Sequence, residues 1–88
     1  MNKSITLKVF QDPGHGWARF PRARLVKLNI ADRISSYSYQ RGANVFLEED
    51  CDLSTLTTAL KERGYDIKFD QSHTNRSSKI RSYNSYRN

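Results

Sequence analysis

The fold is decided by residues 5–20, ITLKVFQDPGHGWARF, because two strand patterns flank a turn in this stretch. Apolar and polar positions alternate over residues 5–11, which is the period of a half-buried strand. Pro13 presets φ and the two glycines accept positive φ, so residues 12–16 predict a turn. Residues 17–20 are then expected to return as a short strand.

Two further elements follow this hairpin. Pro21 suits the first position of a helix, and the spacing of Leu25 and Leu28 favours a short helix over residues 22–29. Serine and tyrosine alternate in the next stretch, which is typical of a strand. We therefore expect a second hairpin over residues 34–48, with its turn at the Arg-Gly-Ala-Asn step.

A second helix is predicted over residues 53–63. Asp52 is a good N-cap, and Gly64 is a good residue to end the helix. The apolar positions recur at three- and four-residue spacing, namely Leu53, Leu56, Ala59 and Leu60. A last strand is expected over residues 65–70. The order is β-β-α-β-β-α-β, an α+β domain over residues 1–70 with a small antiparallel sheet and two short helices.

The composition changes at residue 71. Residues 71–88 contain no acid, and they interleave cations with tyrosines, serines and asparagines. This composition predicts a basic tail that is disordered or that orders on binding. The alternative is a docked segment, because Ile80, Tyr83 and Tyr86 recur every three residues and would share one face of a helix.

Length and charge limit the class of protein. The chain has 88 residues and a formal net charge of +6, so we expect one domain whose partner is a polyanion, an acidic protein surface or anionic lipid. Cys51 is the only cysteine, which excludes an intramolecular disulfide. No stretch resembles a signal peptide or approaches the roughly 20 apolar residues of a membrane span. A cytoplasmic protein with no membrane partner is expected.

Cations and tyrosines predict a nucleic-acid site. Lysine and arginine in the tail suit phosphates, and its tyrosines could stack on bases. Tyr37 and Tyr39 beside Arg41 could form a stacking platform, or they could simply pack in the core. The residues expected to bind nucleic acid are Arg22, Arg24, Lys27, Tyr37, Tyr39, Arg41, Arg76, Lys79, Arg81, Tyr83, Tyr86 and Arg87.

The acidic run over residues 48–52 has three interpretations. It could cap the following helix, ligate a divalent cation, or meet a basic partner protein. The run lacks the glycine and the spacing of a calcium loop, and no zinc spacing is present, so no metal or cofactor is expected. The partner-binding alternative rests on Glu48, Glu49, Asp50 and Asp52.

Catalysis is not expected. Cys51 lies among four carboxylates, which should raise the pKa of its thiol and suppress its reactivity. A small basic ribonuclease or toxin using His15, His73, Arg76 and Lys79 is the third-ranked hypothesis. We therefore interpret the chain as a binding protein and not as an enzyme.

Residues 20–34 resemble part of the swapped-hairpin AbrB/MazE family. In that family a strand ends in a proline, a short helix follows, and a Gly-Asp step precedes the next strand. Here Pro21 and the short helix match, and Ala31-Asp32 stands at the Gly-Asp step. The resemblance implies that the protein binds DNA, and it makes a homodimer one of the expected oligomeric states.

Most of the chain is also similar to small uncharacterised proteins carried by phages and plasmids. The similarity rests on HGW at residues 15–17, on residues 34–42 and 46–52, and on KIRSY at residues 79–83. It implies a mobile genetic element as the setting. The leading hypothesis is a nucleic-acid-binding accessory protein of such an element. The alternative is an inhibitor of host defence, of the anti-CRISPR or anti-restriction type, whose partner is a host nucleoprotein complex.

Overall fold

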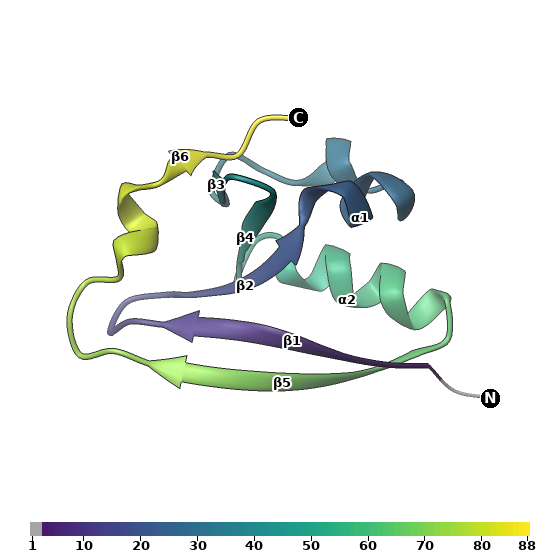
Figure 1. Cartoon of the computed structure of the whole chain (residues 1–88), viewed down its shortest axis with the longest axis horizontal. Helices are drawn as coiled ribbons and strands as arrows, with labels where there is room; N and C mark the ends of the chain where they lie inside the picture. The colour runs from purple at the N-terminus through teal and green to yellow at the C-terminus, as the bar shows by residue number, and fades with distance from the viewer. Residues whose placement is uncertain (1–2) are drawn as a thin grey trace.

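Six strands form one sheet in the computed structural model of the chain, which describes residues 3–88 (Figure 1). The strands are β1 (Lys3–Gln11), β2 (Gly16–Pro21), β3 (Tyr39–Arg41), β4 (Asn44–Glu48), β5 (Tyr65–His73) and β6 (Asn84–Ser85). The helices are α1 (Arg22–Lys27) and α2 (Leu53–Glu62), with 3-10 turns η1 (Ala31–Arg33) and η2 (Lys79–Ser82). The predicted α+β class is confirmed.

The sheet is mixed, so the prediction of an antiparallel sheet is wrong at β5. The strand order is β5-β1-β2-β4-β3-β6, and β1 pairs with β5 in parallel while the remaining pairs are antiparallel. β5 does not pair with β4, the strand before it in the sequence, because α2 carries the chain across the sheet to the far side of β1 (Figure 1). A helical crossover of this kind joins two strands that run in the same direction.

The main core lies between the sheet and the two α-helices. Leu56, Ala59 and Leu60 of α2 are buried against the sheet, as the three- and four-residue spacing predicts. Gly64 has a φ of 85° and allows the chain to leave the helix. No helix within residues 3–88 combines the length and the apolar character needed to cross a membrane.

The second predicted hairpin is shorter than expected. Residues 34–38 form a turn and a loop, and only Tyr39–Arg41 pair as β3. The serines explain the difference, because their hydroxyls donate to Asp52: Ser35 Oγ lies 2.7 Å from Asp52 Oδ2, and Ser38 Oγ also donates to that oxygen. Tyr37 and Tyr39 therefore do not share the face of one strand.

Residues 71–88 do not form a free tail. β5 extends to His73, so the boundary expected at residue 70 falls inside a strand. Beyond it, Ile80 and Tyr83 pack on the sheet face opposite the helices, against Trp17 and Phe46. The alternative expectation of a docked segment identified the right residues, although they do not share one helical face.

The docked segment continues around the edge of the sheet. β6 pairs with β3 on the outer side of the sheet, and Figure 1 shows it beside β3. Tyr86 then enters the main core on the helix side, where its hydroxyl donates to the carbonyl oxygen of Ala31 at 2.5 Å. Residues 78–86 thus contribute to both cores.

Candidate functional site

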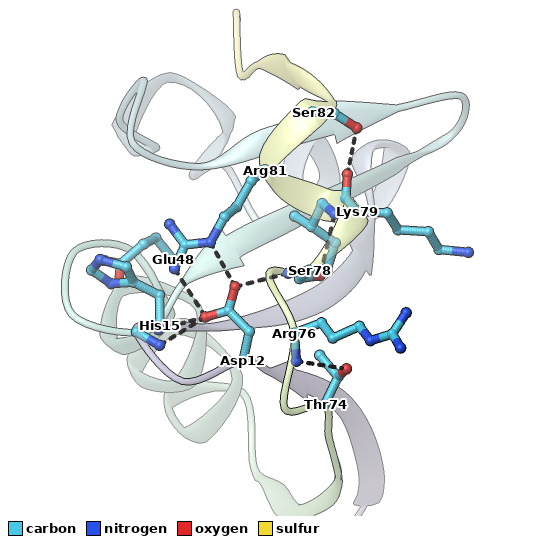
Figure 2. Close-up of polar contacts among 11 residues, drawn as sticks. Asp12, His15, Glu48, Thr74, Arg76, Ser78, Lys79, Arg81 and Ser82 are labelled. Carbon is cyan, nitrogen blue, oxygen red and sulfur yellow. Dashed lines mark hydrogen bonds and ion pairs between the residues drawn. The ribbon is translucent and has the colours of Figure 1, made fainter.

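Asp12, in the turn between β1 and β2, fastens the C-terminal segment to the sheet. Its carboxylate accepts hydrogen bonds from the backbone N–H groups of Gly14 and His15, each at 2.9 Å. The N–H of Ser78 donates to it from the C-terminal segment, also at 2.9 Å. Arg81 binds the same carboxylate through two nitrogens, at 2.6 and 2.9 Å (Figure 2). Because Arg81 is held in this way, it is not a free phosphate ligand as the sequence suggested.

The hydrogen bond from Arg81, with those from the backbone, holds the pKa of Asp12 well below its usual range. A depressed folded-state pKa stabilises the fold above the unfolded pKa of about 3.9, and this stabilisation is lost as the pH falls toward the folded value. We therefore expect Asp12→Asn to lower Tm at pH 5–8. The difference in Tm between this variant and wild type should become smaller below about pH 4. Thermal unfolding followed by circular dichroism across pH 2–8 tests this.

Asp66→Asn is the matched control, because Asp66 is exposed on β5. This variant should remain close to wild type at every pH. A Tm gap for Asp12→Asn that stays constant down to pH 2 would show that the carboxylate charge is not what stabilises the turn.

Cations from three strands lie on the sheet face away from the α-helices. Lys8 of β1 is directly opposite Arg19 of β2, and Arg19 is opposite Phe46 of β4, so all three side chains point to the same face. Arg41 of β3 lies on this face as well, with its guanidinium 5.0 Å from the centre of the Tyr83 ring. Arg19 likewise lies 5.6 Å from the centre of a ring, that of Phe10.

The docked segment adds Lys79 to these cations and closes a small cavity. The cavity has a volume of about 190 Å³. It is lined by Phe10, Arg19, Phe46, Ser78, Lys79, Ile80 and Tyr83. Three of these lining residues are aromatic, and two, Arg19 and Lys79, are cations. We use the name basic sheet face for Lys8, Arg19, Arg41 and Lys79 together with the rings of Phe10, Phe46 and Tyr83.

Several of the predicted nucleic-acid residues belong to this face. Lys79, Arg41 and Tyr83 are part of it. Arg76 is exposed nearby, and Figure 2 shows its charged end and that of Lys79 pointing the same way, away from Asp12.

Other predicted residues lie elsewhere. Arg22, Arg24 and Lys27 are on α1, whose buried Leu25 packs on the helix side of the sheet. Arg22 donates to Gln40 and lies over the Tyr86 ring, and Arg24 lies over Phe20. The α1 cations therefore do not extend the basic sheet face.

The predicted tyrosines also separate. Tyr86 is buried, so its ring is not available to stack on a base. The same burial raises the pKa of its hydroxyl. Tyr39 packs edge-on against Trp17, with ring centres 6.2 Å apart. Tyr37 is the exposed one of the three, at 71%. Arg87, from the same list, is exposed after β6, and its backbone N–H donates to Gln40 at 2.9 Å.

The acidic run is only partly exposed, so two of the four acids expected to meet a basic partner are buried. Asp52 and Glu48 are buried, Glu49 is partly exposed, and Asp50 is exposed. Asp52 stands at the start of α2, but its side chain accepts from Ser35 and Ser38 instead of capping the helix. Two of the four carboxylates are therefore shielded from a protein partner.

Cys51 is exposed, but its surroundings raise the pKa of its thiol, as expected. The adjacent Glu48 carboxylate raises the pKa of the thiol, and partial desolvation and the charges of the neighbouring carboxylates act in the same direction. A raised pKa lowers the thiolate fraction at neutral pH, which disfavours nucleophilic chemistry.

The residues of the basic sheet face that the sequence did not predict are Lys8, Phe10, Arg19 and Phe46. Their signal was present, because Lys8 and Phe10 alternate with the buried Leu7 and Val9 and so point to the face opposite the main core. No protein-family model, curated protein or solved structure matches this chain.

Proposed function

We propose that the protein binds single-stranded nucleic acid through the basic sheet face. The main evidence for this proposal is the cavity of about 190 Å³, which is lined by Arg19 and Lys79 together with three aromatic rings. Cations that hold phosphates beside rings that accept bases are the combination used by single-strand binding surfaces. A base in a duplex is stacked on its neighbours, so a recessed ring favours an unpaired strand.

The polar contacts of the docked segment support this proposal. The bonds of Asp12 to Ser78 and Arg81 hold residues 78–81 against the sheet. Lys79 therefore lies in an ordered turn, η2, and not in a free tail. A pre-ordered site loses less conformational entropy when it binds. Arg41 and Lys8 lie on the same face outside the cavity lining, with Lys8 also 3.8 Å from the carboxylate of Asp70.

The biological role belongs to the same proposal. The resemblance to small phage and plasmid proteins supports an accessory protein of a mobile genetic element, acting on single strands exposed during its replication or transfer. A net charge of +6 favours rapid, salt-dependent association with any nucleic acid.

The test compares two double variants that lose the same charge. Arg19→Ala with Lys79→Ala removes the two cations at the cavity, and Arg63→Ala with Lys61→Ala removes two exposed cations at the end of α2. Each phosphate contact on a single strand contributes about 0.7 to the slope of log K against log salt. We expect the first variant to flatten that slope by about 1.4 and the second to leave it near the wild-type value.

Binding is measured by fluorescence anisotropy with a labelled oligonucleotide across a salt series, and circular dichroism verifies the fold of each variant. Equal losses for both variants would show that net charge alone attracts the oligonucleotide. A wild-type chain that binds no oligonucleotide at low salt would contradict the proposal, and the inhibitor of host machinery would then become the leading hypothesis.

A further inference from the structure

A second cavity lies on the same sheet face, beside the turn between β1 and β2. Its volume is about 270 Å³, and its walls include aromatic rings, a histidine and two carboxylates. The lining residues are His15, Trp17, Tyr37, Tyr39, Glu48, Asp50, Cys51 and Arg81. We call it the carboxylate pocket. It is unrelated to the phosphate-binding role of the basic sheet face, because its acids would repel a phosphate.

Three possible metal ligands meet in this pocket. His15 comes from the β1–β2 turn, Glu48 ends β4, and Asp50 follows in the next turn. One donor atom from each lies within 4.8 Å of the others. His15 Nδ1 is 3.4 Å from Glu48 Oε1. Ligand atoms of a tetrahedral zinc site, each about 2.1 Å from the metal, are themselves about 3.4 Å apart.

Glu48 carries an independent sign that a ligand is missing. Its side chain is only 8% exposed, and within residues 3–88 its Oε1 is fully covered and accepts no hydrogen bond. The other oxygen, Oε2, accepts from the N–H of Asp50 at 3.0 Å, which fixes the carboxylate with Oε1 directed at His15. A buried carboxylate oxygen without a partner is costly, so such oxygens are normally bonded to a donor or a cation.

We propose that His15, Glu48 and Asp50 bind a divalent transition-metal ion of the Zn²⁺ class. One imidazole nitrogen with two carboxylate oxygens suits Zn²⁺ and its neighbours in the first transition row, whereas Mg²⁺ and Ca²⁺ prefer oxygen ligands alone. Three protein ligands leave one tetrahedral position for water or for an atom of a partner. Asp50 is exposed, so its side chain is free to rotate onto the ion.

The competing explanation is a simple ion pair between Glu48 and a protonated His15. That pair would satisfy Oε1 without a metal, but it would give Asp50 no role. The metal site therefore differs from the ion pair in a measurable way, because both His15 and Asp50 must contribute to the affinity for the ion.

The experiment titrates the full chain with Zn²⁺ by isothermal calorimetry and with Co²⁺ by visible absorption. We expect one ion per chain and a d–d spectrum without the intense band of a thiolate ligand. Because loss of even an outer-shell partner weakens metal sites by about 10–100-fold, His15→Ala and Asp50→Asn should each weaken Zn²⁺ at least this much. His73→Ala and Asp66→Asn are the controls, because both residues are exposed on β5 outside the pocket, and they should stay within about threefold of wild type.

Three results would overturn the proposal. One is the absence of Zn²⁺ binding by the folded wild-type chain at millimolar metal. Another is an affinity that His15→Ala leaves unchanged while its circular dichroism matches wild type. The last is binding that disappears in His73→Ala or Asp66→Asn, since the ion would then sit at a different surface residue.

Discussion

A chain that ends at Ser77 is expected to lose its native fold. The truncation removes Ile80 and Tyr86, each 3% exposed and each packed in a different core. Burial of one large apolar side chain contributes about 1.5–3 kcal/mol. A small domain is stable by only about 5–15 kcal/mol in total. The loss of β6 and of the Arg81–Asp12 bonds adds to the effect, so circular dichroism should report a largely unfolded chain at 37 °C.

A chain that ends at Tyr86 is the matched control. It lacks only Arg87 and Asn88, which are exposed, and should unfold within a few degrees of the full chain. If the chain that ends at Ser77 kept a cooperative transition at the wild-type temperature, residues 78–88 would be an appendage and the two-core packing would be wrong.

Leu56→Ala is the substitution expected to cost the most stability. Leu56 has no exposed surface and lies in the main core between α2 and the sheet. Truncation of a buried leucine removes its transfer free energy and leaves a cavity, at a cost of about 2–5 kcal/mol. Urea denaturation should show a lower midpoint with an unchanged m-value, because the surface exposed on unfolding hardly changes.

Thr58→Ala serves as the control, since Thr58 is exposed on the same helix. It should change the free energy of unfolding by no more than about 0.5 kcal/mol. Equal effects of the two substitutions would mean that α2 does not bury the face assigned to it.

The parts of the fold predicted from sequence are those set by local patterns. Alternation over residues 5–11 and the Pro-Gly turn after it indicated β1 and β2. The leucine spacing and Gly64 gave α2 within one residue of its observed end. In these stretches the residues that determine the conformation are neighbours along the chain, so one window contains the whole signal.

The parts that failed depend on partners far apart in the sequence. Nothing near residue 65 indicates that β5 pairs with β1 and not with β4. The docking of the C-terminal segment depends on the bonds between Asp12 and Arg81, and no local sequence pattern predicts that these two residues come together. Ser38 and Asp52 are a similar pair, and their bond accompanies a loop over residues 34–38, where the hairpin predicted over residues 34–48 was expected to begin as a strand.

The candidate site shows the same division. Arg41, Arg76, Lys79 and Tyr83 were identified by composition, because exposed cations and tyrosines suit nucleic acid wherever they occur. Arg19 was missed because only the docking of the C-terminal segment on the sheet places Lys79 beside it. His15 and Glu48 were considered separately, and only the fold brings a turn and the end of β4 into one pocket.

The strand order also has a consequence for how the protein is made. Both outer strands of the sheet, β5 and β6, lie after residue 64, whereas the four strands they flank are translated first. Until β5 leaves the ribosome, β1 exposes an unpaired edge along Lys3–Gln11. Unpaired edges invite pairing with other chains. The nascent chain is therefore most prone to aggregate between the synthesis of β1 and that of β5, and its sheet is completed only when the last of these strands is released.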